Sequence, residues 1–177
     1  MTHRGLLLTM TEPPAGMEEE FNAWYDDEHM AERLSIPGFL SARRWVADCR
    51  PGEGKYLATY ELESLAVLHS ERYLFHYKNQ TAWSRRCLGK CVVFKRWACE
   101  QVEPGDADSD PRAKALLLVA GASPAMRVAV GPALLERRFT ASEGPQPHVA
   151  LFELAEPREA IAHPGKEGLV RLYRAYG

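Results

Sequence analysis

The feature that most constrains the fold is a pair of strand-like segments joined by a tight turn in the first half of the chain. In the segment 39–48 the residues alternate, so that Phe39, Arg43 and Trp45 share one side. The glycine- and proline-rich stretch 50–54 then favours a turn, and 55–62 is a second strand-like run. The pattern predicts an antiparallel hairpin.

Helices and further strands flank this hairpin. We expect a strand at 4–11, a helix at 17–34 that ends before Pro37, a helix from Ser64 to about 75, a helical piece at 81–87 and a strand at 91–102. The resulting order is β-α-β-β-α-β, which is that of a ferredoxin-like unit.

The rest of the chain repeats this pattern in a weaker form. Segment 104–112 is rich in Pro, Gly and acidic residues, as linkers are. After it we expect strands at 113–121, 136–141, 148–154 and 169–176, a short helix at 125–135 and a helical turn at 157–163. The sequence predicts an α+β fold with a ferredoxin-like unit at 1–103, a linker at 104–112 and a degenerate second ferredoxin-like half at 113–177.

Composition excludes several classes of function. The formal net charge is −2, and the basic doublets are scattered, so nucleic acid and anionic membranes are not expected partners. No stretch is long and apolar enough for a membrane span or a signal peptide. The four cysteines form no Cys-x-x-Cys pair, as expected for free thiols in a reducing compartment, and we expect a cytoplasmic protein.

The expected helix at 17–34 carries acids inside its own apolar stripe. That stripe includes Phe21, Trp24 and Tyr25, and at about 100° per residue Glu28 and Glu32 fall within it. A buried carboxylate must be paired, neutral or beside a polar cavity, because an isolated buried charge is too costly. The pattern therefore indicates a pocket beside this helix.

Several motifs around this helix resemble those of a known superfamily. They are Trp24-x-x-x-Glu28-His29-x-x-x-Arg33, Pro37-Gly38-Phe39, Arg43-Arg44-Trp45 and Lys55-Tyr56-Leu57-Ala58-Thr59-Tyr60-Glu61. Over the first half of the chain the sequence resembles the dimeric α/β-barrel superfamily, and most closely its EthD-like and related ferredoxin-like members. The resemblance implies two four-stranded sheets packed into a barrel with helices outside, and a small and often aromatic ligand between sheet and helices. The second half could supply the facing sheet within one chain, or it could extend a unit that dimerises. We expect a homodimer, because sheet faces in this architecture need cover. Similar proteins include cofactor-free oxygenases, cyclases, decarboxylases, isomerases and haem enzymes.

Four residues are candidates for catalysis. Tyr25, His29 and Arg33 are spaced i, i+4, i+8 along one edge of the helix, and Glu28 lies one position inward. A histidine beside a carboxylate can move protons near neutral pH. Arg43 and Tyr25 are candidates to hold an oxyanion. In the structural alternative, Glu28 pairs with Arg43 or Arg44 and only fastens the helix to the sheet.

Aromatic and histidine side chains are candidates for substrate binding. With Arg33, the set is Trp24, Phe39, Trp45, Tyr60, His69, Tyr73, His76 and Trp83. Aromatic stripes are also typical of ordinary core, so that interpretation stays open. His69 and His76 on the second helix could ligate a haem iron, or join His29 in a metal site, but helical spacing alone requires neither, and we expect no metal.

The sequence predicts a cofactor-independent enzyme that acts by proton transfer on a hydrophobic, aromatic or polyketide-like acid or ketone. Isomerisation, cyclisation, decarboxylation and dehydration all suit these residues better than hydrolysis, since a Ser/Cys-His-Asp triad is absent from the sequence. One alternative is a non-catalytic binding or accessory protein. Another is a haem-dependent monooxygenase that uses His69 or His76.

Overall fold

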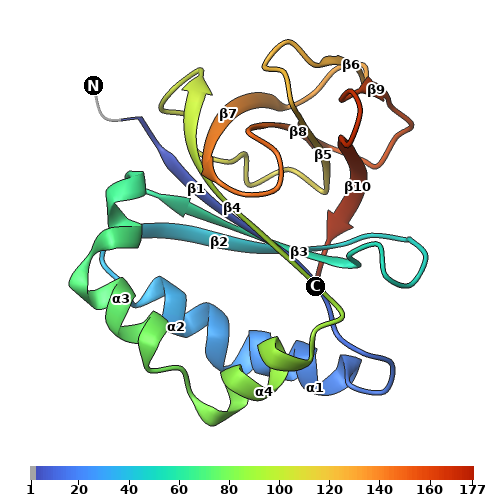
Figure 1. Ribbon diagram of the computed structural model, residues 1–177. Helices are drawn as coiled ribbons and strands as arrows, with labels where there is room; N and C mark the ends of the chain where they lie inside the picture. Colours follow the sequence, from blue (N-terminus) through green and yellow to red (C-terminus); the bar gives the residue numbers. More distant parts are fainter. Residues whose placement is uncertain (1–2) are drawn as a thin grey trace.

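The computed structural model describes residues 3–177 and contains a closed antiparallel barrel with helices on one side (Figure 1). Around the barrel the strands follow the order β1-β3-β2-β10-β5-β8-β7-β4. The barrel strands are β1 (Gly5–Glu12), β2 (Phe39–Val46), β3 (Tyr56–Leu62), β4 (Val93–Glu103), β5 (Ala115–Gly121), β7 (Leu135–Glu143), β8 (His148–Leu154) and β10 (Leu169–Ala175). The barrel closes within one chain, so its sheets need no second chain to complete them.

The helices all belong to the first half of the chain. They are α1 (Glu18–Trp24), the π-helical turn η1 (Tyr25–His29), α2 (Met30–Leu34), the 3-10 helix η2 (Leu65–His69), α3 (Glu71–Lys78) and α4 (Ala82–Lys90). The predicted helix at 17–34 is confirmed, although a π-helical turn interrupts it. The predicted helix from Ser64 to about 75 is confirmed in its start but is divided in two. The 3-10 helix η2 begins directly after Ser64, and the α-helix begins after Ser70, whose hydroxyl accepts a hydrogen bond from the Tyr73 amide at 3.2 Å. None of the described helices is long and apolar enough to cross a membrane.

These helices pack on the outer face of the first-half strands (Figure 1). Phe21 and Trp24 are completely buried beneath them, and Tyr60 of β3 is 1% exposed. Tyr73 of α3 lies against Phe39, with ring centroids 6.0 Å apart. Burial of these large aromatic side chains is the main force that holds helices to sheet.

A β-bulge in β2 changes which residues face the helices. The hairpin with β3 is confirmed, but its register shifts between Phe39 and Ser41. Leu40 is the extra residue and is 47% exposed. After the bulge, Arg44 faces the helices, whereas Arg43 and Trp45 face the barrel interior. The prediction that Phe39, Arg43 and Trp45 share a face is wrong, because strict alternation ends at a bulge.

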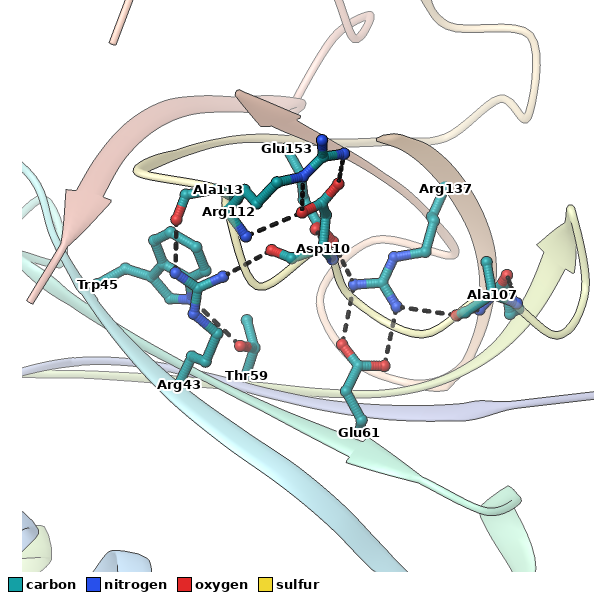
Figure 2. A network of polar contacts seen from close by, with 11 residues as sticks. Arg43, Trp45, Thr59, Glu61, Ala107, Asp110, Arg112, Ala113, Arg137 and Glu153 are labelled. Atoms are coloured by element: carbon teal, nitrogen blue, oxygen red, sulfur yellow. Dashed lines mark hydrogen bonds and ion pairs between the residues drawn. The ribbon is translucent and has the colours of Figure 1, made fainter. Parts of the chain in front are cut away.

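A buried ion-pair network joins the two halves inside the barrel (Figure 2). The Arg137 guanidinium of β7 donates to both oxygens of Glu61 in β3, each at 2.8 Å, and to Glu153 in β8 at 2.6 Å. Burial of these groups keeps the bonds unscreened by water. The network therefore ties the first half of the barrel to the second.

The predicted linker at 104–112 is packed against the barrel (Figure 2). Arg43 donates to the Asp110 carbonyl at 3.1 Å and to the Ala113 carbonyl at 2.5 Å, and its guanidinium lies 4.3 Å from the Trp45 ring centroid. The Asp110 amide in turn donates to Glu153. The segment therefore takes part in the same polar network.

The second half has no helix within residues 113–177, all of which the structure describes. The predicted helix at 125–135 and helical turn at 157–163 are wrong: β6 (Arg127–Ala129) pairs with β9 (Ile161–His163). The sequence Gly131-Pro132 interrupts the first of these segments and prevents a helix through it. The β6–β9 pair and its loops cover a smaller apolar core that includes Leu117 and Phe152.

Candidate active site

A cavity of about 70 Å³ lies between the helices and the outer face of the first-half sheet. Its lining comes from β1, β3, β4 and the helices, and consists of Leu7, Thr9, Tyr25, His29, Arg33, Tyr60, Tyr73, Tyr77, Gln80, Leu88, Phe94 and Arg96. Tyr77 and Phe94 are 56% and 50% exposed and form a rim. Sites for drug-sized molecules measure roughly 300–1,000 Å³, so a ligand of that size requires these rim side chains to turn outward.

The π-helical turn supplies two of the cavity's side chains. Tyr25 and His29 are its first and last residues, and both line the cavity, as does Arg33 one turn later. Their exposures are 2%, 8% and 7%, so all three are buried within the protein. Single π-helical turns inside α-helices are frequent at functional sites.

His29 is held in an aromatic environment. Its ring lies 4.4 Å from the Trp24 ring centroid and meets Tyr25 edge-on at 5.2 Å. Burial, together with the positive charges of Arg33 and Arg44, lowers the pKa of His29 to about 3. Its Nδ1 is buried and has no hydrogen-bond partner among residues 3–177. The imidazole is therefore neutral at neutral pH.

Glu28 does not pair with either predicted arginine. Its carboxylate accepts hydrogen bonds from the hydroxyls of Thr81 and Ser84, at the start of α4. Ser84 Oγ, 3.2 Å from Glu28, also accepts a hydrogen bond from Trp24 Nε1 at 3.0 Å. Glu28 thus fastens η1 to α4 and contributes no side chain to the cavity lining.

The two arginines of the β2 motif have separate tasks. Arg44 donates to Asp26 at 2.8 Å and to Asn22 at 2.5 Å, and its guanidinium lies 4.4 Å from the Tyr25 ring centroid. This contact fastens the helix to the sheet, which is the task predicted for Glu28. Arg43 points into the barrel and lies outside the cavity lining.

Hydroxyl groups supply neutral hydrogen-bond donors to the cavity. Burial raises the pKa of Tyr25 and raises that of Tyr60 well above its ordinary value, so both phenols stay protonated. Tyr25 Oη lies 3.4 Å from Thr9 Oγ1, and Tyr60 Oη is buried without a partner among the described residues. A hydroxyl in this state is available to a ligand oxygen.

Two guanidinium groups complete the lining. Arg33 donates to Glu32 at 2.9 Å, and its guanidinium carbon lies 5.6 Å from the Tyr73 ring centroid. Arg96 of β4 donates to Tyr73 Oη at 3.3 Å and forms an ion pair with Glu143. Among residues 3–177, no Asp or Glu side chain lines the cavity.

The structure brings together some of the predicted site residues. Tyr25, His29, Arg33, Tyr60 and Tyr73 line the cavity. The other candidates lie elsewhere: Trp24 and Phe39 pack behind it, Trp45 faces the barrel interior, Trp83 is half-buried on α4, His69 is exposed, and His76 Nδ1 lies 3.4 Å from Glu32 Oε1.

Sequence reasoning missed the β4 wall of the cavity. Arg96 and Phe94 pair with Thr9 and Thr11 of β1, a register that depends on contacts between distant segments. Tyr77 was accessible to sequence reasoning, because it lies one helical turn after Tyr73.

The residues present do not fit a haem or a metal ion. In the part of the chain that the structure describes, no group of three or more His, Cys, Asp or Glu side chains is placed to hold a metal. His69 is exposed on η2, and His76 contacts Glu32, so neither lies in the cavity lining. A porphyrin is also far larger than a cavity of about 70 Å³.

Comparison with known proteins shows the fold. No protein-family model matches the sequence, and no curated protein sequence matches it significantly. An anthrone oxidase-like protein has a similar structure, with a TM-score of 0.64 at 8% identity over 100% of this chain and 92% of its own. A proposed chlorite dismutase matches with a TM-score of 0.58 at 9% identity, over 100% of this chain and 96% of its own. A proposed monooxygenase from Fusobacterium nucleatum matches with a TM-score of 0.57 at 10% identity, over 98% of this chain and 93% of its own.

These similarities support a barrel fold of the α/β type for this chain, and the superfamily named from the sequence motifs stays a prediction. The EthD-like branch stays a prediction, because none of the three is named as such. At these identities the similarity concerns the fold, and function has to be argued from the site.

Proposed function

We propose that this protein is a cofactor-independent enzyme that catalyses proton transfer on a small aromatic acid or ketone bound in the cavity. The observation that carries the proposal is the buried imidazole of His29 at the cavity wall, with its pKa lowered to about 3. Strongly perturbed titratable groups inside a cavity are typical of functional sites.

Each polar group of the lining has a task in this proposal. Neutral His29 is in the protonation state that accepts a proton from an acidic C–H or O–H group. The protonated phenols of Tyr25 and Tyr60 donate hydrogen bonds to the oxyanion that develops. Arg33, in place of the predicted Arg43, stabilises the negative charge of this oxyanion. Glu28 is a positioning residue, since it holds η1 against α4.

The substrate itself improves His29 as a base. Positive charge on Arg33 and Arg44 contributes to the low pKa of His29 in the free protein. An anionic oxygen beside Arg33 offsets part of that repulsion and favours the imidazolium. Isomerisation, cyclisation, decarboxylation and dehydration all include such a proton transfer, and the names of the structural neighbours are those of small-molecule enzymes.

A non-catalytic binding protein is the second candidate, and one observation favours it. A histidine with a pKa of about 3 is a weak base at neutral pH. In that case His29 acts only as a neutral hydrogen-bonding group in a ligand site. Ligand binding without turnover identifies this alternative.

The architecture supports one further proposal. The first-half strand order β4-β1-β3-β2 has a counterpart in β10-β5-β8-β7, which supports two ferredoxin-like units, 1–103 and 113–177, the second without helices. A homodimer and a cytoplasmic location stay predictions. Because the barrel closes within one chain, its sheets already cover each other, and the need for sheet cover no longer argues for a dimer.

The test compares turnover by wild-type protein and His29→Gln on a panel of aromatic acids and ketones, with His69→Gln as the matched control. We expect His29→Gln to lower kcat by roughly 10²–10⁴-fold, the usual contribution of a general base. The exposed His69 lies outside the cavity lining, so its variant should keep full activity. Unchanged turnover in folded His29→Gln would refute the assignment. Binding without turnover by the wild type would establish the alternative.

A further inference from the structure

We infer that the cavity selects aromatic ligands that carry a carboxylate, held between Arg33 and Arg96. This inference rests on the proposed function only in placing the ligand in the same cavity. The two guanidinium groups come from separate elements, α2 and β4, and both line the cavity. Arginine is well suited to carboxylates, because its planar N–H groups match the two oxygens.

Tyr73 brings the two arginines to the same end of the cavity. Arg33 lies over the face of its ring, 5.6 Å from the centroid, and Arg96 donates to its hydroxyl at 3.3 Å. Both cations therefore contact one side chain. We therefore place the ligand carboxylate beside Tyr73, between the two guanidinium groups.

The arginines retain hydrogen-bonding capacity for a ligand. Arg33 is 7% exposed, and its Nε is buried with no partner among the described residues. An unpartnered buried donor is unfavourable, and a ligand oxygen would satisfy it. Arg96 pairs with Glu143, whose side chain is 57% exposed, so water screens this pair and a ligand can displace it.

The rest of the lining accommodates the aromatic part of the ligand. The residues with wholly apolar side chains are Leu7, Leu88 and Phe94, and within residues 3–177 no acid lines the cavity to oppose the two cations. His29 adds no charge, because it is neutral. Apolar walls with a few convergent polar groups are typical of sites for small molecules. At about 70 Å³ the cavity is smaller than one of roughly 150 Å³ that holds benzene, so the exposed rim side chains Tyr77 and Phe94 must turn outward to admit a single aromatic ring.

The test measures binding of benzoate and of its neutral counterpart benzamide by ligand-observed NMR titration. The proteins are wild type, Arg96→Gln and the control Arg72→Gln, which changes an exposed arginine of α3 outside the cavity lining. We expect wild type to bind benzoate at least tenfold more tightly than benzamide. Arg96→Gln should lose most of this preference while its benzamide affinity stays unchanged, and Arg72→Gln should behave as wild type.

Arg33 needs a separate design, because its removal leaves the partly buried Glu32 carboxylate without its arginine and with only His76 beside it among the described residues. The double variant Arg33→Gln/Glu32→Gln removes both charges and should also lose the preference for benzoate. Absence of benzoate binding to wild type at millimolar concentration would overturn the inference, as would equal affinity for the two ligands. A preserved benzoate preference without turnover on the substrate panel would refute only the proposed catalysis.

Discussion

The two halves of the barrel share a strand order but differ in what covers their outer faces. Helices cover the first-half strands and leave a cavity lined by His29, Arg33 and Arg96. The short β6–β9 pair covers β5 and β8 over an apolar core that includes Val119 and Met126. The comparison shows that the strands provide the frame, whereas the helices bring in most of the titratable groups on which the proposed chemistry depends.

The largest loss of stability is expected from a substitution in the ion-pair network that joins the two halves. Arg137→Met leaves Glu61 and Glu153 buried without their cation, which should lower the free energy of unfolding by about 3–5 kcal/mol. Urea denaturation measures this loss. Arg112→Met, which removes an exposed pair with Asp110, should cost under about 1 kcal/mol. Similar losses in both variants would show that the halves do not depend on the buried network.

The second prediction concerns acid stability, which should depend on the helix-covered half. The pKa of His29 is about 3 in the folded protein against 6.5 ordinarily, so the unfolded chain binds a proton first as pH falls. The stabilising effect of neutral His29 is complete above pH 6.5 and is lost as pH decreases towards 3. Between pH 6.5 and 4, wild type should lose roughly 3 kcal/mol more than His29→Gln.

Denaturation series at several pH values measure this difference. His148→Gln is the control in the second half, since that side chain is partly exposed on β8. Its pH dependence should match that of wild type. Parallel curves for wild type and His29→Gln would show that His29 titrates normally in the folded protein.

The third prediction tests whether Glu28 has a structural or a catalytic role. Glu28→Gln keeps the shape of the side chain but weakens its bonds to Thr81 and Ser84, at a cost of about 1–2 kcal/mol. Thermal unfolding should detect this loss, while turnover on any identified substrate changes much less than in His29→Gln. A loss of kcat as large as that of His29→Gln, with unchanged stability, would place Glu28 in the chemistry.

The smallest effect is expected at a helix cap. Ser70→Ala removes the side-chain bond to the Tyr73 amide and should cost about 1 kcal/mol. The ligand should also bind more weakly, because α3 carries Tyr73 and Tyr77 of the cavity. The second-half control Ser123→Ala, on an exposed loop, should change neither quantity. Equal ligand affinity in the two variants would show that ligand binding does not depend on the stability of α3.

Local patterns were enough to predict the first-half elements and part of the site. The strand-like run at 55–62 and the apolar stripe of 17–34 predicted β3 and the long helix, because each depends on neighbouring residues. The same helical spacing placed Tyr25, His29 and Arg33 together. In the second half, 125–135 and 157–163 were predicted to be helical, whereas they contain the short strands β6 and β9, which pair with each other across a long stretch of sequence.

By itself, the sequence determined which segments form the first-half strands and helices, and that an unusual set of side chains shares one helix edge. Only the tertiary structure decided that the barrel closes within one chain, that a bulge turns Arg43 inward, and that Arg96 joins the cavity. The physical reason is one of range. Periodicity and capping act over a few residues, whereas strand register, bulges and ion-pair partners depend on contacts between segments far apart in the chain.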